Sequence, residues 1–418
     1  MPNILDRLEI DMEKKIFSFL LVFFIIFLGI DVITIIMALI QDFGVIYWYL
    51  IPMLVALIFA GVTVDARRRV WCLLLLIPEA ILTLVVAFVI TETLPLIFLW
   101  IFIGLLSGFT IAAMLAFFAD ITKMEQRGKV TGLIAGIAWI VSGILLSWYS
   151  STLFASSAFI IVIAIIKLAG AGIAIYILFT SIDKENQPPS DREYATQSIL
   201  DKITASIDFI WNNSKFRTYL IAFILIWLAQ GIFMPIGGLG QEDYQSYQQI
   251  ASIGFAVGGL LLIVSGYLLD KGRKQVLFYG AILCTISFLS YFFPIGAVFL
   301  AGIPIALTTI LIVLGDIAPQ DMRGRYYAVF LLFSFLAFFC GFLIGLGIGG
   351  GYQVGGNPWV VLVCAIITGL GLLLIYLKGE ESNIEEVTFP PSSVPPSVMD
   401  LNSTETSFID DSVPEDNL

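Results

Sequence analysis

Long apolar runs separated by short polar segments dominate the chain, and most of these runs are about 20 residues long. A transmembrane helix needs roughly that length to cross the hydrocarbon core of a bilayer. We therefore expect an all-α integral membrane protein with twelve transmembrane helices. The predicted spans are residues 16–40, 43–64, 70–90, 95–119, 130–150, 156–180, 216–238, 248–269, 275–293, 295–315, 326–350 and 358–377.

The polar segments predict how the chain is organised around these spans. Residues 181–215 form a long polar linker with a predicted interfacial helix, and they separate a bundle at 16–180 from a second bundle at 216–378. A short lead-in precedes the first span at residues 1–15. Each predicted bundle contains six helices, which makes two pseudo-symmetric six-helix bundles.

The basic residues predict the same number of spans and also the orientation. Of the 21 bases, only Lys167 does not lie on the side reached after an even number of spans. Cytoplasmic loops of membrane proteins collect Lys and Arg. We therefore expect a multi-pass protein of the cell membrane with cytoplasmic N- and C-termini.

Composition agrees with a membrane protein, because 59% of the residues are hydrophobic and only 13% are charged. The net charge of −11 comes almost entirely from residues 379–418, which hold ten acids and no base. This segment is predicted to be a disordered acidic cytoplasmic tail. The acidity therefore belongs to the tail and does not indicate a binding site for a cation.

The chain has no histidine, and its four cysteines are scattered among apolar runs. The usual zinc and haem ligands and the commonest acid–base residue are thus missing. We expect no enzymatic activity, no metal, no cofactor and no nucleic acid partner. The expected partners are the lipid bilayer and a small-molecule solute, and the protein is expected to function as a monomer.

Two polar signatures occur once in each half and in the same order. After the second span of each half the chain reads GVTVDARRRV or GYLLDKGRKQ, and after the fourth span it reads DITKMEQRGK or DIAPQDMRGR. A duplicated bundle of membrane helices is typical of transporters. The candidate residues of these signatures are Gly61, Asp65, Arg67, Arg69, Asp120, Arg127 and Gly128 in the first half, and Gly266, Asp270, Arg273, Lys274, Asp316, Arg323 and Gly324 in the second.

These signatures resemble those of the major facilitator superfamily of secondary transporters, whose loop between spans two and three reads Gly-x-Leu-x-Asp-Arg-x-Gly-Arg-Lys. The second-half copy is the closer match, although one residue is missing from its basic cluster. The resemblance implies that Asp65 reaches the start of span eleven and that Asp270 reaches the start of span five. It also implies that the bases pair with Asp120 and Asp316. Together these contacts would form a cytoplasmic gate between the halves.

Four polar residues inside predicted spans are candidates for substrate binding or coupling. Asp31 lies in span one, which lines the central cavity in the family, so it is either a substrate or proton site or a carboxylate bonded to hydroxyls such as Thr34. Glu79 and Lys167 share a depth and form either a structural or a coupling pair. Gln230 in span seven is the polar cavity candidate of the second half.

The sequence thus predicts a transporter that moves a small solute by alternating access, and Asp31 raises the hypothesis of proton coupling. Apart from Arg217 at the start of span seven, the second half has no charge inside its spans, and no Arg lies deeper inside a span of either half. A neutral, amphipathic or cationic solute is therefore favoured over a phosphate or a dicarboxylate. The alternative is a transporter-like sensor or scaffold that signals through the acidic C-terminal tail.

Overall fold

The computed structural model describes residues 10–32, 43–66, 69–89, 93–152, 157–180, 182, 204, 208, 211–233, 244–348 and 358–380. All regular elements in these residues are helices. The α-helices of the first half are α2 (Lys14–Phe24), α4 (Phe43–Ala66), α5 (Arg69–Leu73), α6 (Leu76–Val89), α7 (Thr93–Ile121), α8 (Arg127–Thr152) and α9 (Ser157–Thr180). Those of the second half are α12 (Ser214–Phe233), α13 (Tyr244–Leu269), α14 (Arg273–Ile286), α15 (Gly302–Ile317), α16 (Arg323–Ile348) and α17 (Pro358–Lys378).

Helices of other kinds interrupt or precede several of these spans. A π-helix, Ile25–Asp31, continues α2, and a 3₁₀-helix, Ser287–Tyr291, continues α14. Another 3₁₀-helix, Pro294–Ala301, leads into α15. Short 3₁₀-turns, Met124–Gln126 and Gln320–Met322, precede α8 and α16.

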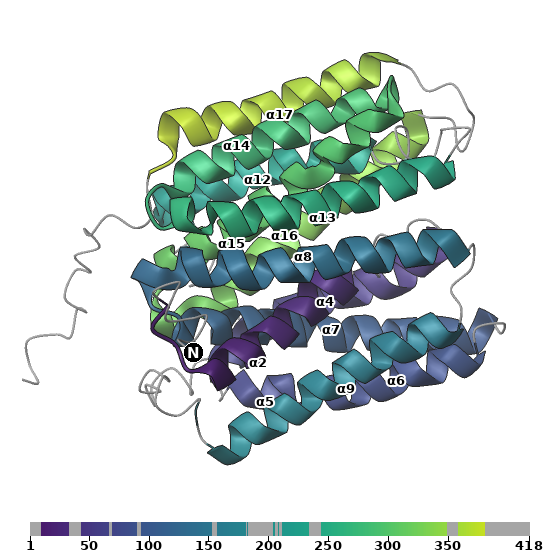
Figure 1. Cartoon of the computed structure of the whole chain (residues 1–418), viewed down its shortest axis with the longest axis vertical. Helices are drawn as coiled ribbons and strands as arrows, with labels where there is room; N and C mark the ends of the chain where they lie inside the picture. The colour runs from purple at the N-terminus through teal and green to yellow at the C-terminus, as the bar shows by residue number, and fades with distance from the viewer. Residues whose placement is uncertain are drawn as a thin grey trace, which may run out of the picture. The chain divides into compact units, whose positions relative to one another are not determined.

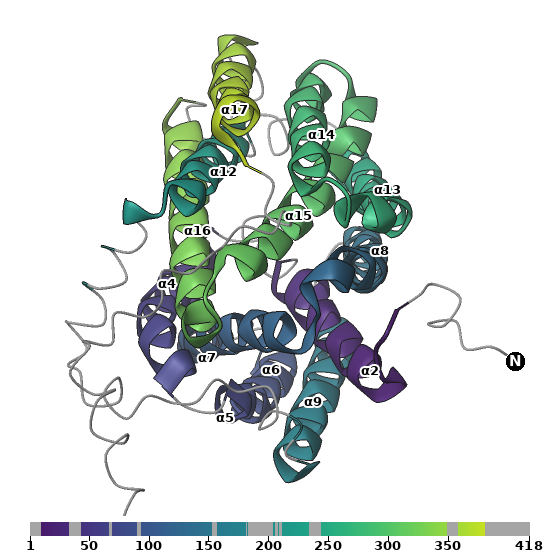
Figure 2. The same ribbon diagram turned by 90° about the vertical axis from the view of Figure 1, so that its left-hand side faces the viewer.

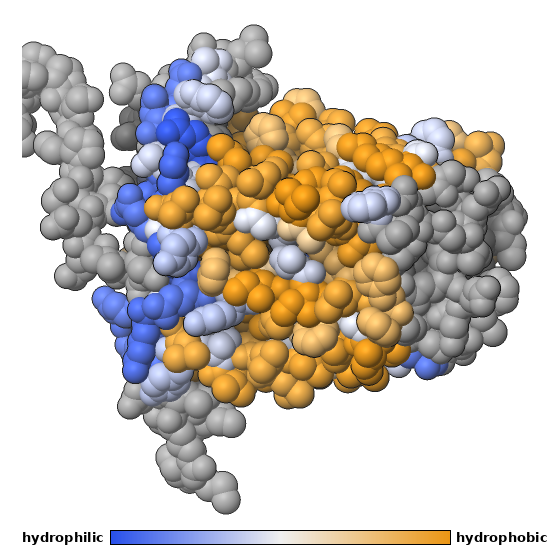
Figure 3. Space-filling model, turned by 90° about the horizontal axis from the view of Figure 1, so that it is seen from above, coloured by the Kyte–Doolittle hydropathy of each residue, from blue (hydrophilic) through white to orange (hydrophobic). Residues whose placement is uncertain are grey.

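Ten helices in the described part of the chain are long and apolar enough to cross a membrane. The first and ninth predicted spans are the two that fall short as single helices, and they correspond to α2 with its π-helix and to α14 with its 3₁₀-helix. Each of the twelve predicted spans therefore has a helical counterpart. Figure 3 shows a broad apolar band across the helices and hydrophilic residues at one end of it.

We call this hydrophilic end the basic side, because the described bases other than Lys167 gather there. Its members include Arg69, Lys123, Arg127, Arg273 and Arg323. The predicted interfacial helix of the linker lies outside the described residues, apart from residues 204, 208 and 211–215. The acidic tail is described only at residues 379–380. The boundaries of these two segments therefore stay predictions.

The two halves meet along two pairs of helices, α8 with α13 and α4 with α16 (Figures 1 and 2). The α8–α13 pair approaches closely through glycines, since a Cβ atom at Gly136 would lie 2.7 Å from the carbonyl oxygen of Gly259. The α4–α16 pair uses larger side chains, and the rings of Tyr47 and Phe339 pack edge to face with centroids 5.6 Å apart. Both pairs carry residues of the repeated signatures at the basic side.

Candidate functional site

Two aspartates reach across from one half to the other at the basic side. Asp65 of α4 accepts hydrogen bonds from the backbone N–H groups of Gly324 and the next residue, both at 2.8 Å, at the start of α16. Asp270 follows α13 and accepts from Gly128 and the next residue, at 2.7 and 3.2 Å, at the start of α8. The first N–H groups of a helix lack partners within it and favour a negative charge. Each carboxylate thus caps a helix of the opposite half, as the resemblance implies.

A glycine at each helix start leaves room for the capping carboxylate. A Cβ atom at Gly324 would lie only 2.7 Å from Oδ1 of Asp65. At Gly128 the added atom would lie 2.8 Å from the backbone nitrogen of Asp270. Partial burial raises the pKa of the Asp270 carboxyl, while the two N–H donors act in the opposite direction. The glycine of each Arg-Gly pair is therefore needed because a larger side chain would clash with the capping aspartate.

Ion pairs reinforce the cap that Asp65 makes. Asp120 at the end of α7 pairs with Arg69 of its own half and, at 3.0 Å, with Arg323 of the other half. Arg69 also donates to the carbonyl oxygen of Gln320 at 3.0 Å, on the opposite half. Asp120 is therefore held between bases from both halves.

The second half repeats this arrangement. Asp316 at the end of α15 pairs with Arg273 of its own half and, at 2.5 Å, with Arg127 of the first half. Arg273 donates to the carbonyl oxygen of Met124 at 2.6 Å, again across the boundary. We call this set the clasp. Its charged members are Asp65, Arg69, Asp120, Arg127, Asp270, Arg273, Asp316 and Arg323.

The remaining predicted gate residues have other positions. Gly61 on α4 packs against α16, and Gly266 on α13 packs against α8. The ammonium of Lys274 donates to the carbonyl oxygen of Tyr376 on α17 at 3.0 Å, which ties it to α17. Arg67 lies outside the described residues.

Sequence reasoning missed Tyr327, which lies among the four arginines of the clasp. Its side chain is fully buried, and its hydroxyl donates to the carbonyl oxygen of Leu311 at 2.8 Å. The corresponding position after the first Arg-Gly pair is Thr131. This difference between the two copies was the signal available in the sequence.

The segment before α2 also contacts the loop that leads into α8. Asp11 forms an ion pair with Lys123, and its backbone N–H donates to the side-chain oxygen of Gln126 at 2.9 Å. The hydrogen bond from Lys123 lowers the pKa of the Asp11 carboxyl. Both charged side chains are exposed, so this pair contributes little to stability.

The three charged residues predicted inside the spans lie together in the first half. The ammonium of Lys167 on α9 is 2.9 Å from Oδ1 of Asp31 and also pairs with Oε1 of Glu79 on α6. All three side chains are buried. The sequence had paired Glu79 with Lys167 and left Asp31 apart, and the structure joins Asp31 to that pair. We call the three residues the charge cluster.

A π-helix brings Asp31 to the cluster. Asp31 is the last residue of Ile25–Asp31, and π-helical turns are frequent at functional sites. The hydroxyl of Ser142 on α8 donates to the carbonyl oxygen of Leu28 at 2.7 Å within this segment. Thr34, the hydroxyl considered as a partner of Asp31, lies outside the described residues.

The two acids of the cluster have different surroundings. Glu79 accepts hydrogen bonds from Ser107 at 2.7 Å and from Thr110 at 3.2 Å, in addition to its contact with Lys167. Oδ2 of Asp31 is buried and has no hydrogen-bond partner among the described residues. Two carboxylates share one ammonium, so the ionised cluster carries one excess negative charge. Protonation of Asp31 would remove that charge without breaking the bonds of Glu79.

Tyr49 on α4 is a further polar neighbour that the sequence did not single out. Its side chain is buried, and its hydroxyl lies within reach of Ser107 and of the charges on Asp31, Glu79 and Lys167. Nothing in the spacing of Tyr49 distinguishes it from its neighbours Tyr47 and Trp48, which are exposed. Only the three-dimensional packing places it beside the cluster.

Replacing Lys167 by Met is expected to destabilise the protein strongly. The change leaves Asp31 and Glu79 as buried acids without a counter-ion, and removal of one partner from a buried ion pair costs about 3–5 kcal/mol. Thermal unfolding of the purified protein in detergent measures the effect. The triple variant Lys167→Met, Asp31→Asn, Glu79→Gln should recover most of the loss. If the Lys167→Met protein unfolds at the wild-type temperature, that result would contradict the ion pairing.

Gln230 of α12 is buried, and its amide donates to the carbonyl oxygen of Cys284 at 3.1 Å. The hydroxyl of Ser287 donates to the same oxygen at 2.7 Å. These bonds lie where α14 changes into the 3₁₀-helix Ser287–Tyr291. The structure therefore places the Gln230 amide against an irregular segment of span nine.

The comparisons with known proteins agree with this architecture. The family model described as Major Facilitator Superfamily matches residues 19–339 and 219–403. No curated protein matches the chain.

Solved structures share the fold. The proton:xylose symporter XylE bound to 6-bromo-6-deoxy-D-glucose is 12% identical, with a TM-score of 0.62 over 88% of this chain and 96% of that one. The E. coli fucose:proton symporter FucP is 14% identical, with a TM-score of 0.56 over 87% of this chain and 98% of that one. A second FucP structure, in the outward conformation, is 13% identical with a TM-score of 0.57. Because the family model spans most of the chain, this multi-pass membrane protein belongs to the major facilitator superfamily of transporters.

Proposed function

We propose that the protein is a secondary transporter that moves a small solute by alternating access between its two halves. The observation that carries this proposal is the reciprocal clasp, in which Asp65 and Asp270 each cap a helix of the opposite half. Such contacts form and break as a set when two rigid halves rock against each other. The clasp would then be the gate that closes one end of the solute path.

The chemistry of the clasp suits a reversible gate. The attraction within a buried ion pair is largely offset by the cost of removing its charges from water. When the halves separate, water can solvate the exposed arginines and aspartates and compensate for the lost contacts. The contacts of the gate would thus form only in one geometry of the two halves. The gate could nevertheless open without a prohibitive free-energy cost.

We also propose that the basic side is cytoplasmic and that both termini lie there, in the cell membrane. The positive-inside rule supports this orientation, because the described bases other than Lys167 gather at that side. The closed clasp then represents a state that is shut toward the cytoplasm. We expect a monomer to be sufficient for transport, since both halves of the gate belong to one chain.

Proton coupling through Asp31 is part of this proposal. Oδ2 of Asp31 has no partner among the described residues, and the cluster carries an excess negative charge, so Asp31 is the acid that gains most from a proton. XylE and FucP are named as proton symporters of xylose and fucose, which makes neutral sugars the first solutes to test. A neutral solute also agrees with the absence of Arg from the interior of the predicted spans, since Arg217 lies at the start of span seven.

The proposal is tested by a thermal-shift screen of the purified protein against sugars, amines and amphipathic compounds. A solute that binds the folded protein raises its unfolding temperature, and the rise increases with the ratio of solute concentration to Kd. We expect one chemical class to stabilise the protein and to enter proteoliposomes that contain it. Stabilising solutes that show no uptake into proteoliposomes would contradict a transporter and favour a sensor.

The second candidate function is that of a sensor or scaffold that signals through residues 379–418, and the acidic tail is the observation that favours it. Truncation after Gly379 separates the two functions. A transporter should keep its solute flux, because the clasp and the charge cluster lie outside the tail. A scaffold should lose its output, measured as binding of a cytosolic partner, while the truncated protein still folds.

A further inference from the structure

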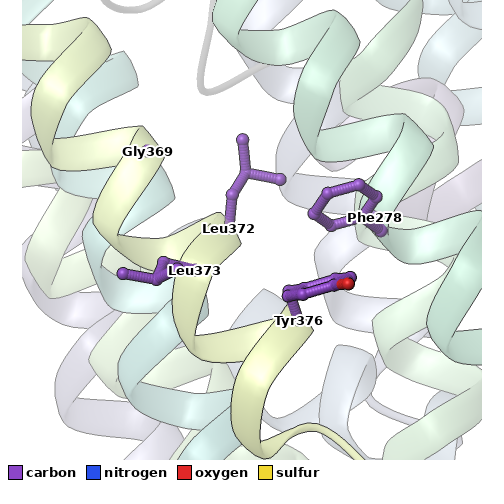
Figure 4. A pocket seen from close by; sticks show the side chains of 5 residues that line it. All are labelled: Phe278, Gly369, Leu372, Leu373 and Tyr376. Carbon is purple, nitrogen blue, oxygen red and sulfur yellow. The ribbon is translucent and has the colours of Figure 1, made fainter.

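A groove opens between α14 and α17 on the outer surface of the second half (Figure 4). It encloses about 310 Å³, and its lining is almost entirely apolar. The lining residues are Phe278, Gly369, Leu372, Leu373 and Tyr376. A Cβ atom at Gly369 would meet no other atom within 4 Å, so the missing side chain leaves this part of the groove open.

The groove faces the surroundings of the helices and is remote from the boundary between the halves. Tyr376 and Leu373 are 63% and 50% exposed, which places the groove within the surface that lipid would cover. The α14 and α17 helices contact each other and other helices of the second half. The groove is therefore separate from both the clasp and the charge cluster.

Its depth matches one leaflet of a bilayer. Tyr376 lies two residues before Lys378, the last residue of α17 at the basic side, and Gly369 lies nine residues before it. At 1.5 Å per residue the groove extends to about 13 Å from that end of the helix. Half of a hydrocarbon core of about 30 Å has the same extent.

A basic side chain marks the shallow end of the groove. Lys274 in the first turn of α14 donates to the carbonyl oxygen of Tyr376, which fixes an ammonium beside the groove. Lys378 in the last turn of α17 is also exposed, but it follows Tyr376 by two residues and therefore lies on the opposite face of the helix. An apolar channel of leaflet depth with a positive charge at its mouth complements a lipid that has an acyl chain and an anionic headgroup.

We propose that this groove binds an anionic glycerophospholipid from the leaflet at the basic side. One acyl chain would lie along Phe278, Leu372 and Gly369, and the headgroup phosphate would lie near Lys274. The site is independent of the transported solute, so its occupancy can be measured without a transport assay.

Native mass spectrometry of the delipidated full chain in detergent tests the proposal. Palmitoyl-oleoyl phosphatidylglycerol and the matching phosphatidylcholine are titrated separately. We expect the first phosphatidylglycerol to bind about fivefold more tightly, since a lysine near the membrane surface contributes about 1 kcal/mol toward an anionic lipid. Equal binding of the two lipids would overturn the proposal.

Two sets of variants locate the site. Gly369→Trp fills the groove and should weaken phosphatidylglycerol binding about tenfold, whereas Gly172→Trp on α9 should not change it. Gly172 is a matched control, because it is exposed and, like Gly369, has no atom within 4 Å of its Cβ position. Lys274→Gln should reduce phosphatidylglycerol binding to that of phosphatidylcholine, whereas Lys378→Gln on the opposite face of α17 should leave it unchanged. Lys274→Gln also provides the test if Gly369→Trp does not fold. Wild-type lipid preference in the Lys274→Gln protein would contradict the site.

Discussion

Alanine at both Asp65 and Asp270 is expected to shift the protein toward a state that is open at the basic side. Each substitution removes a carboxylate that accepts two backbone N–H bonds across the boundary between the halves. Loss of a helix cap costs about 0.5–2 kcal/mol. Both substitutions destabilise only the closed state, because the caps cannot form once the helices separate. A combined loss of about 3 kcal/mol would change the ratio of the two states more than a hundredfold.

Cysteine labelling measures this shift. Thr131 lies one turn inside the clasp on α8 and is fully buried, so Thr131→Cys in a protein without its native cysteines reports opening of the basic side. A membrane-impermeant maleimide added from that side should react at least about tenfold faster in the double aspartate variant than in the parent. Each single variant should give an intermediate rate.

Asp11→Ala is the matched control for this experiment. It removes an acid from the same end of the protein but leaves every contact of the clasp in place. Its labelling rate should equal that of the parent. Unchanged labelling of the Asp65→Ala, Asp270→Ala protein would show that the caps do not hold the gate.

The clasp could be predicted from the sequence for a physical reason. A bilayer permits few charges, so the charges that remain stand out at the helix ends, and duplication shows which of them correspond. The two repeated signatures together therefore held both partners of each contact, and the family resemblance implied how they pair. Tyr327 escaped because it is an aromatic residue in an apolar helix, and only the packing shows that four arginines surround it.

The charge cluster was only partly predictable. Glu79 and Lys167 could be paired from their similar depth along the spans. The direction in which the Asp31 side chain points, however, depends on the π-helix that ends at Asp31. Irregular helices leave no clear hydropathy signal, because their residues are as apolar as those of a regular span. Contacts from distant helices stabilise them, such as the bond from Ser142 to Leu28 and the bond from Gln230 to Cys284.

Asp31→Asn is expected to abolish accumulation of solute against a gradient while leaving solute exchange intact. Asparagine has the size and hydrogen-bonding character of a protonated aspartate, but it cannot exchange a proton. Lys167 keeps Glu79 as its counter-ion in this variant, so the fold should be retained. A thermal melt close to that of the wild type checks that expectation, and Asp11→Asn serves as the same substitution at an exposed acid.

The most direct test of coupled transport is uptake into proteoliposomes whose interior is more alkaline than the medium. The labelled solute is the one that stabilises the protein in the thermal-shift screen. The wild type should raise the internal solute concentration above the external one, whereas Asp31→Asn should only equalise the two concentrations. Accumulation by Asp31→Asn to the wild-type level would contradict proton coupling through the charge cluster.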